Sequence, residues 1–446
     1  MKILFVENRY KTWFWEALSL EMMGQVEATE VIWLVQNPVF CPKLGKVRVV
    51  PFPSKEQLAP AKPTAENLHI ENADRNINYY GGNSLHYEHY RTEIYRILSD
   101  EMPDVIVGES TLFHELLVIE WCKKNDVKYL HPIMIGYPGG RFTIYRNDTK
   151  DFISRSDDVP TREHCLNVID SIRKRERIPD YMQISNGQEV DRYYPLPGTF
   201  RDKLKVFLGY VSGEKYNTPS PFTKYYLDRK VRRNLIKWNK ISEIRKGLGD
   251  GKYRLLYPMQ LQPESNLDVW GQEYRNQERL ILEISNKLPK NWILQVKLNP
   301  KAKYELSEKL LGVVEAKSNI QPVHFDCGMD MVFPQSNLVC TVTGTVAVEC
   351  VLSGKPLIQL GPGITDGFSG CVKLATLDYI PQILCAVESG EYAFSSDDEC
   401  IDLIRLLYSS TFPGQVSDPA SKPSVLQKNN ISIVAKNIIS AVNSCK

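Results

Sequence analysis

The chain lacks a strong excess of either charge and lacks long apolar runs. Its 446 residues include 55 basic and 53 acidic side chains, for a formal net charge of +2. A surface that holds nucleic acid phosphates needs a larger basic excess, so we expect no nucleic acid partner, and any anionic ligand must be bound locally. No uninterrupted apolar stretch approaches the ~20 residues that span a bilayer, which leaves only peripheral membrane association.

The chain also lacks the residue patterns of metal sites. Its ten cysteines are scattered from Cys41 to Cys445, without a Cys-x-x-Cys pair or a His/Cys cluster at zinc spacing. This usage favours reduced cysteines packed in the core of a cytosolic protein. No Asp-x-Asp motif is present, so we expect no metal ion and no cofactor. The apolar run at Ile3–Val6 is broken too soon by Glu7 and Arg9 to be a signal peptide, and it is predicted to be a strand.

The length of the chain predicts two domains, because 446 residues exceed what one hydrophobic core usually supports. Alternating strand and helix patterns predict the α/β class, with two Rossmann-like domains that each carry a parallel sheet covered by helices. The N-terminal domain is expected over 1–200, with a connecting region to about residue 250. The C-terminal domain is expected over 251–446, and its final helix at 431–442 could pack back on the junction.

The hydrophobic pattern places individual elements within each half. Residues 51–84 hold several prolines and asparagines and predict a long surface excursion of the first domain. In the first half the expected strands are 3–6, 31–35, 105–108 and 129–135, and the expected helices are 13–23, 87–98, 112–122 and 165–174. In the second half the expected strands are 255–259, 292–298 and 338–342, and the expected helices are 274–288, 380–387, 400–408 and 431–442.

The segment 224–246 is the most basic part of the chain. Lysines and arginines alternate there with apolar residues, and only Asp228 and Glu243 oppose them. One interpretation is a helix that faces a membrane surface or an anionic acceptor. The other is a solvated helix that bridges the two domains, which the two acidic residues favour.

The segment 337–359 has the pattern of a β-α-β unit. Leu338–Val342 is short and β-branched, as in a strand covered on both faces, and Gly354 stops the helix that follows. The turn Thr343–Thr345 is therefore expected at a carboxyl end of the sheet. Its hydroxyls and the N–H groups of the following helix can hold a phosphate or carboxylate, although many such turns bind nothing. Glu349 could hold ribose hydroxyls or merely complement the helix dipole.

Two more polar groups follow predicted strands of the second half. Gln260 and Gln262 are spaced to point in one direction and could bind sugar hydroxyls, and Glu264 could act as a base or nucleophile. Lys297 could neutralise a phosphate, and Asn299 lies beside it at the strand end. Because ligands of open α/β folds bind at the carboxyl edge of the sheet, these groups and the Thr343–Thr345 turn predict one ligand site.

The first half offers fewer candidates for an acceptor site. Glu109 follows a predicted strand and could serve as a general acid or base, or it could cap the next helix. His114 lies one turn further on. Arg141 follows two glycines and could bind an anionic acceptor.

The stretch 256–361 resembles the capsule polysaccharide synthesis family. The resemblance rests on Tyr-Pro-Met-Gln-Leu-Gln-Pro-Glu264, Val-Lys-Leu-Asn-Pro300 and Thr-Gly-Thr-Val-Ala-Val-Glu349, in that order along the chain. The family includes glycosyltransferases that use CMP-activated 3-deoxy-2-keto sugars, notably β-Kdo transferases. It implies a GT-B fold, in which two Rossmann-like domains face each other across a cleft and the C-terminal domain holds the donor.

The resemblance also implies roles for single residues. Thr343, Gly344 and Thr345 match the motif expected to hold the carboxylate or phosphate of the donor, and Glu349 matches the acid near the ribose. Glu264 matches an acidic position that we expect to be catalytic. Where the family has a Lys-x-His-Pro motif, this chain has Asn299 in place of the histidine, which can donate a hydrogen bond but carries no charge.

The sequence therefore predicts a metal-independent, cytosolic glycosyltransferase at the inner face of the membrane. It would transfer a Kdo-like or nonulosonic acid sugar from a CMP donor to a growing cell-surface glycan, such as a capsule or a lipopolysaccharide O-antigen. Two alternatives remain open: a nucleotide-sugar epimerase or hydrolase of similar fold, and a non-catalytic glycan-binding subunit of an export complex.

Overall fold

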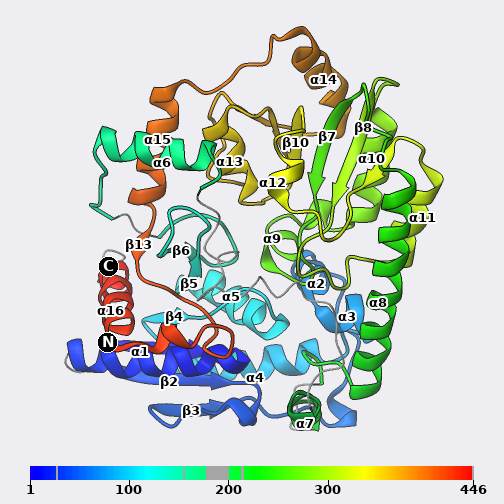
Figure 1. The fold of residues 1–446 in the computed structure, drawn as a ribbon. Coiled ribbons are helices and arrows are strands. Elements are labelled where there is room, and N and C mark those ends of the chain that lie inside the picture. Colours follow the sequence, from blue (N-terminus) through cyan, green and yellow to red (C-terminus); the bar gives the residue numbers. More distant parts are fainter. Residues whose placement is uncertain (27–28, 154–155, 177–199, 212–214, 444–446) are drawn as a thin grey trace. The chain divides into compact units, whose positions relative to one another are not determined.

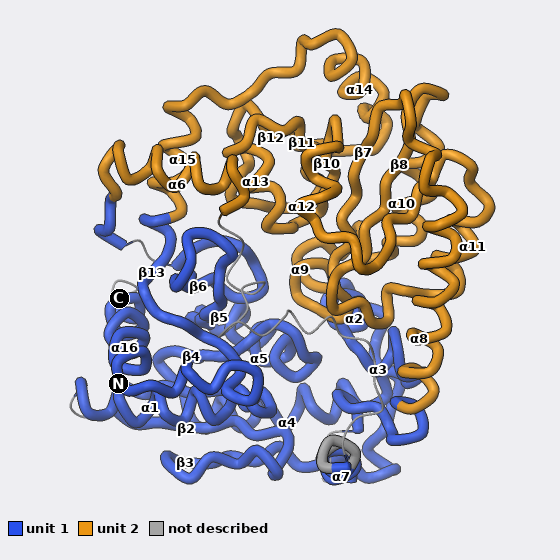
Figure 2. Tube along the Cα trace, in the orientation of Figure 1, with its two compact units in different colours: residues 1–159, 198–224, 408–446 blue, residues 160–197, 225–407 orange. Residues whose placement is uncertain are grey.

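The computed structural model consists of two compact units, which are coloured separately in Figure 2. The chain enters each unit more than once. The residues described below are 1–26, 29–153, 156–176, 200–211 and 215–443. Unit 1 comprises 1–159, 198–224 and 408–446, and unit 2 comprises 160–197 and 225–407.

Unit 1 is built on a seven-stranded sheet in the order β13-β6-β5-β4-β1-β2-β3. Strands β1 to β5 are parallel, as the alternating pattern predicts for β1, β2, β4 and β5, whereas the pattern does not predict β3. β6 turns back antiparallel to β5, and β13 pairs antiparallel with β6. The strands are β1 (Lys2–Val6), β2 (Glu30–Val35), β3 (Lys46–Val49), β4 (Val105–Val107), β5 (Lys128–Met134), β6 (Arg141–Arg146) and β13 (Phe412–Pro413).

The helices of unit 1 largely follow the predicted periodicity. An exception is the excursion at 51–84, which contains the helices α2 and α3 rather than loop alone, and α2 packs against α5. The helices are α1 (Thr12–Gln25), α2 (Ala65–Ala73), α3 (Arg75–Tyr79), α4 (Tyr87–Glu101), α5 (Phe113–Asn125), α7 (Phe200–Gly209) and α16 (Lys428–Asn443).

The C-terminal segment completes unit 1 instead of closing unit 2. Figure 1 shows α16 beside α1, and the buried residues Ile431, Val434 and Ile438 of α16 join the core cluster that contains Trp15 and Leu18 of α1. The apolar face of α16 and the free edge of β6 both need a partner, which explains why 408–446 lies with the N-terminal residues. The division thus differs from two consecutive domains, and residues 177–199, the end of the expected N-terminal domain, lie outside the described residues.

Unit 2 contains a six-stranded, fully parallel sheet in the order β12-β11-β10-β7-β8-β9. Both sheets follow the alternation expected for an α/β chain, so the prediction of two Rossmann-like halves is confirmed. The facing of the two halves across a cleft stays a prediction. The strands are β7 (Tyr253–Pro258), β8 (Trp292–Lys297), β9 (Ile320–Pro322), β10 (Leu338–Thr341), β11 (Leu357–Gln359) and β12 (Cys371–Lys373).

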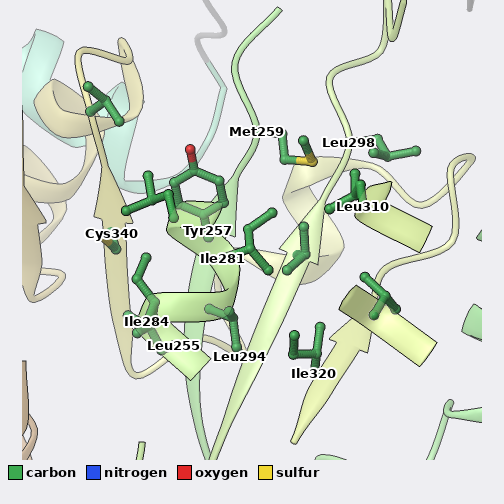
Figure 3. Packing of buried hydrophobic residues seen from close by; sticks show 14 of the residues in the cluster. Leu255, Tyr257, Met259, Ile281, Ile284, Leu294, Leu298, Leu310, Ile320 and Cys340 are labelled. Carbon is green, nitrogen blue, oxygen red and sulfur yellow. The ribbon is translucent and has the colours of Figure 1, made fainter. Parts of the chain in front are cut away.

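One face of this sheet packs against α10 and α11 to form the core of unit 2. Figure 3 shows Leu255 and Tyr257 of β7 and Leu294 of β8 meeting Ile281 and Ile284 of α10. Because side chains alternate along a strand, Lys297 lies on the opposite face from Val296 and outside this apolar cluster. The alternation therefore frees one face near the carboxyl edge for polar side chains.

The helices of unit 2 begin and end at recognisable signals. Ser307 caps α11 by accepting a hydrogen bond from the Leu310 N–H at 3.0 Å, and α13 ends at Gly354 with φ of 62°. Within the described residues, no helix is long and apolar enough to span a membrane. The helices are α6 (Arg162–Arg173), α8 (Pro221–Ile244, whose first four residues belong to unit 1), α9 (Ser265–Asp268), α10 (Gln277–Lys287), α11 (Glu308–Ala316), α12 (Met329–Val332), α13 (Val346–Ser353), α14 (Ile380–Ser389) and α15 (Asp397–Ser409).

Candidate functional site

Three polar loops follow the three adjacent strands β10, β7 and β8 of unit 2. Their order in the sheet shows that the turn at Thr343–Thr345, the loop at 259–264 and the loop at 298–307 leave neighbouring carboxyl ends. The predicted neighbourhood of these elements is thus confirmed, although their function is not tested by it. This edge is where open α/β sheets bind ligands.

Gln260 supports the Thr343–Thr345 turn with its side-chain amide. In the orientation that satisfies both polar atoms, its oxygen accepts from the N–H groups of Thr343 (2.8 Å) and Gly344 (3.1 Å), and its nitrogen donates to Thr343 Oγ1 (3.1 Å). The Thr343 hydroxyl also donates to the Asn266 carbonyl at 2.7 Å. Gln260 and Thr343 are buried and hold the turn in shape, and their predicted contact with a donor stays a prediction.

The hydrogen-bond donors that remain at this turn are the hydroxyl of Thr345 and the N–H groups of Thr345 and Val346. The Thr345 side chain makes no capping hydrogen bond, and the residue is half-buried. Within the part of the chain that the structure describes, no hydrogen bond is seen from the N–H of Thr345 or of Val346. These groups lie at the positive end of α13, where orphan N–H groups favour an anion. An anion here would meet the Thr345 hydroxyl and two N–H groups.

Glu349 is buried in the first turn of α13 and is paired with Arg175. Its Oε2 lies 3.0 Å from Nη1 of Arg175. Arg175 Nε also lies 2.5 Å from Asp330 Oδ1, and its guanidinium lies over the ring of Phe333. Nothing near Glu349 in the sequence signals this partner, because only the fold brings Arg175 to α13. The ribose contact predicted for Glu349 would share its carboxylate with this guanidinium.

Gln262 belongs to a buried amide network beneath the loop at 259–264. Its Nε2 donates to Asp268 Oδ1 at 2.8 Å, and its Oε1 accepts from Gln277 Nε2 at 3.0 Å. Gln277 also accepts from the Gln260 N–H at 2.9 Å. Gln260 and Gln262 are therefore both hydrogen-bonded to Gln277, which holds the loop in place. Their predicted contact with sugar hydroxyls is untested.

Glu264 lies at the end of this loop and is exposed to solvent. It precedes α9, and its N–H donates to Asp268 Oδ2 at 3.1 Å. Its Oε2 accepts from Asn266 Nδ2 at 3.1 Å. The backbone is thus held by the buried Asp268, while the carboxylate reaches solvent, as a nucleophile or base must do to meet a substrate.

Lys297 and Asn299 flank the end of β8. Lys297 is buried although it carries a charge, and its Nζ donates to the Leu298 carbonyl at 3.4 Å. Its ammonium group brings a positive charge to this edge of the sheet, and the binding of a ligand phosphate by Lys297 stays a prediction. Asn299 Oδ1 accepts from the Lys301 N–H at 2.9 Å, which leaves its NH₂ group as the donor that it could offer a ligand.

Glu305 is a residue of this edge that the sequence pattern does not single out. It is buried, and its Oε2 accepts from the N–H groups of Lys303 (3.1 Å) and Gln262 (3.4 Å). Its Oε1 has no hydrogen-bond partner among the described residues. Burial raises the pKa of Glu305 to about 8, so the carboxyl keeps its proton at neutral pH. Glu305 is not recognisable as a site residue in the sequence, because only its burial distinguishes it from a surface glutamate.

We expect Glu305→Gln to change the pH dependence of stability. Between pH 4.5, the ordinary pKa of a glutamate, and the folded-state pKa of about 8, the unfolded chain loses this proton and the folded chain keeps it. The wild-type free energy of unfolding therefore falls as pH rises through this window, by up to about 1.4 kcal/mol per pH unit. The variant lacks this loss, so its stability relative to wild type should rise from pH 5 to pH 8 in urea unfolding.

Glu315→Gln is a matched control for this experiment, because Glu315 is an exposed acid on the neighbouring helix α11. It should leave the pH dependence unchanged. The buried Asp74 of unit 1, whose pKa burial raises to about 7, titrates in the same window in every variant and cancels in the difference. An equal effect of Glu305→Gln at pH 5 and pH 8 would contradict the assignment.

In unit 1, Glu109 is held as a carboxylate. It forms an ion pair with Lys11, and its Oε2 lies 3.6 Å from Nε2 of the buried His131. Burial opposes the charge, but Lys11 and His131 outweigh it and lower the pKa of Glu109 to about 2. An ionised Glu109 cannot donate a proton at neutral pH, and such a low pKa makes it a weak base. The acid or base role of Glu109 stays a prediction.

His114 and Arg141, the predicted acceptor-binding residues, are both buried and engaged within unit 1. His114 contacts the Glu7 carbonyl at 3.1 Å and the Asn217 amide at 3.2 Å through its two ring nitrogens. Arg141 donates to Thr411 Oγ1 (2.8 Å), the Thr411 carbonyl (2.8 Å) and Asp158 (2.6 Å). Arg141 thereby ties β6 to the C-terminal segment. An acceptor would have to displace these bonds, so the predicted contact stays a prediction.

A metal ion needs several ligating side chains close together. Among the described residues, no group of three or more His, Cys, Asp or Glu side chains is placed to hold one. The nine cysteines of this part of the chain are all free thiols.

Comparisons with known proteins give similarity at the level of whole structures only. No family model matches the chain, and no curated protein matches it. KpsC of Thermosulfurimonas dismutans, a β-Kdo 2,7 transferase, is similar with 8% identity, full coverage of both chains (100% each) and a TM-score of 0.38. UDP-GlcNAc 2-epimerase of Neisseria meningitidis, bound to UDP-GlcNAc, shows 13% identity over 99% of this chain and 100% of that one, with a TM-score of 0.27.

A third similar structure is Alr3699/HepE of Anabaena in complex with UDP-glucose. It shows 11% identity over 99% of this chain and 100% of that one, with a TM-score of 0.30. Identities and TM-scores this low support no argument about activity. The resemblance to the capsule polysaccharide synthesis family therefore stays a prediction, and function must be argued from the residues of the site.

Proposed function

We propose that the protein is a glycosyltransferase that holds its activated sugar donor at the carboxyl edge of the unit 2 sheet. One observation carries the proposal: three adjacent strands end in a turn at the N-terminus of α13, a buried lysine and a loop with an exposed carboxylate. A charged donor needs the first two groups, and displacement at its anomeric carbon needs the third.

The donor is proposed to be a CMP-activated Kdo-like or nonulosonic acid sugar, and the acceptor a growing cell-surface glycan. The motifs around Glu264, Lys297 and the Thr343–Thr345 turn support this choice through their resemblance to the capsule polysaccharide synthesis family. Thr345 and Lys297 would bind the negative charge of the donor, and Glu349, oriented by Arg175, would bind the ribose. Asn299 would contribute one neutral hydrogen bond.

Glu264 is proposed to act on the reacting atoms. The bond between the anomeric carbon and the phosphate oxygen breaks, and CMP leaves with the electron pair. If Glu264 attacks the anomeric carbon, an acceptor hydroxyl attacks the same carbon in a second step, its proton passes to water, and Glu264 leaves as the carboxylate, so configuration is retained. If it instead takes the proton of the acceptor hydroxyl, one displacement inverts the configuration. Lys297 and the N–H groups at Thr345 and Val346 would stabilise the charge on the leaving phosphate.

A nucleotide panel tests the donor. We expect CMP to raise the thermal midpoint more than CDP, UDP or GDP, because CMP would retain the phosphate that the turn and Lys297 hold. A nucleotide at about 100 times its dissociation constant stabilises a protein by about 2.7 kcal/mol. Differential scanning fluorimetry measures the shift. A shift with UDP and none with CMP would contradict the proposed donor while leaving a glycosyltransferase of another donor class.

Product analysis separates transfer from the other enzyme classes. A glycosyltransferase consumes the donor productively only with an acceptor, whereas an epimerase or hydrolase changes the nucleotide sugar without one. Donor that remains unchanged under both conditions, together with nucleotide binding, would favour a non-catalytic subunit.

A further inference from the structure

The helix α8 presents two contrasting faces in unit 2. One face is buried and includes Leu235, Trp238 and Ile241, and Trp238 Nε1 donates to the Val323 carbonyl at 2.8 Å. Figure 1 shows α8 running beside α11, and Arg245, just after α8, donates to carbonyls at the end of α11. The helix is thus anchored from Val231 onward, and the opposite face of this part is exposed to solvent.

The solvent-facing side of α8 combines cations with apolar and aromatic side chains. At 100° per residue, its exposed positions from Tyr225 to Ile244 fall within one continuous stripe. Ile236 is 67% exposed and Ile244 is 74% exposed, although isoleucine usually packs in a core. The stripe, called the α8 face below, consists of Tyr225, Tyr226, Arg229, Arg232, Arg233, Ile236, Lys237, Lys240, Glu243 and Ile244.

The charge of the α8 face contrasts with that of the whole chain. The face holds five basic residues and one acidic residue, whereas the complete sequence is nearly neutral at +2. Arg233 is paired with Glu308 of α11, but Lys237 and Lys240 have no ion-pair or hydrogen-bond partner among the described residues. Lys237 and Lys240 therefore remain available to an external polyanion.

We propose that the α8 face docks the protein on an anionic lipid surface, with Lys237 and Lys240 at the headgroups and Ile236 and Ile244 at the acyl boundary. A soluble polyanion, such as an acidic glycan, would match the cations but would leave both isoleucines and both tyrosines in water. A lipid interface accepts all of them, because it offers negative charge beside apolar chains and suits amphipathic tyrosine rings. This inference is independent of the proposed chemistry of unit 2.

Vesicle co-sedimentation of the full chain tests the proposal. The wild type should bind phosphatidylcholine vesicles that contain phosphatidylglycerol, bind phosphatidylcholine alone weakly, and lose binding as salt rises. Each cation near an anionic surface contributes roughly a fivefold factor. The double variant Lys237→Glu, Lys240→Glu should therefore bind at least about 25-fold more weakly.

A second variant separates lipid from a soluble polyanion. Ile236→Ser, Ile244→Ser should weaken binding to the anionic vesicles and leave binding to heparin unchanged, whereas the lysine variant should weaken both. The matched control, Lys290→Glu, Lys309→Glu, makes the same charge change at exposed positions elsewhere in unit 2 and should bind vesicles nearly as the wild type does. Circular dichroism confirms that each variant folds.

Two results would overturn the inference. One is a wild type that does not bind the anionic vesicles. The other is an isoleucine variant that binds vesicles as well as the wild type while the lysine variant loses both vesicles and heparin, since that outcome assigns the α8 face to a soluble polyanion.

Discussion

Glu264→Gln is expected to lower the rate of sugar transfer by about 10²- to 10⁴-fold, the range that a positioned acid or base contributes. The amide keeps the size of the side chain and its contact with Asn266, but it can neither attack an anomeric carbon nor accept a proton. Because Glu264 is exposed, the fold and the binding of CMP should change little. Rates of CMP release with acceptor present, together with the CMP-induced thermal shift, measure the two effects separately.

Glu273→Gln is the matched control, since Glu273 is an exposed acid of the same segment. It should transfer at the wild-type rate. Full activity of Glu264→Gln would remove Glu264 from the mechanism and direct attention to other acids of the site. Equal loss of activity and CMP binding would instead assign Glu264 to donor binding.

Gly344→Ala is expected to abolish most of the stabilisation by nucleotide. A Cβ at this position would lie 2.8 Å from Thr341 Oγ1, which is wholly buried and accepts a hydrogen bond from the Gly344 N–H at 3.2 Å. The turn must therefore shift away from Thr341, and the N–H groups of Thr345 and Val346 shift with it. Overpacking of this kind costs about 1–3 kcal/mol of stability, and the thermal shift with CMP measures the loss of the site.

Gly312→Ala is the control substitution, at a glycine of unit 2 where an added Cβ has room. Gly312 lies inside α11, and a Cβ there would meet nothing within 4 Å. Alanine should raise stability by about 0.5–1 kcal/mol through its helix propensity and leave the CMP-induced shift unchanged. A wild-type CMP shift in Gly344→Ala would show that the Thr343–Thr345 turn does not hold the ligand.

Local signals in the sequence predict the strands and helices of the two sheets because each depends on neighbouring residues. The β-branched run before Thr343 and the glycine at 354 define β10 and α13, and the alternation along β7 and β8 sets which side chains enter the core. The adjacency of β10, β7 and β8 then follows from the rules for parallel sheets, which is why the three candidate loops are expected at one edge.

Tertiary contacts explain what the sequence could not predict. Arg175 reaches Glu349, and Glu305 reaches the N–H of Gln262, across separations that carry no periodic signal. The sequence predicts free amides at the turn, yet Gln260 accepts from two of them, because a buried amide oxygen needs donors as much as an anion does. Lys11, which forms an ion pair with Glu109, likewise comes from a distant part of the sequence, directly before α1.

The return of 408–446 to unit 1 sets the order in which the chain can fold during synthesis. The edge of β6 and the apolar face of α1 are covered by β13 and α16, which follow all of unit 2 in the chain. Unit 2 has all its strands by residue 373 and can close its sheet while unit 1 still waits for its final strand and helix. Unit 1 is therefore completed only after the residues of unit 2, and a chain truncated before residue 408 would expose the core of unit 1.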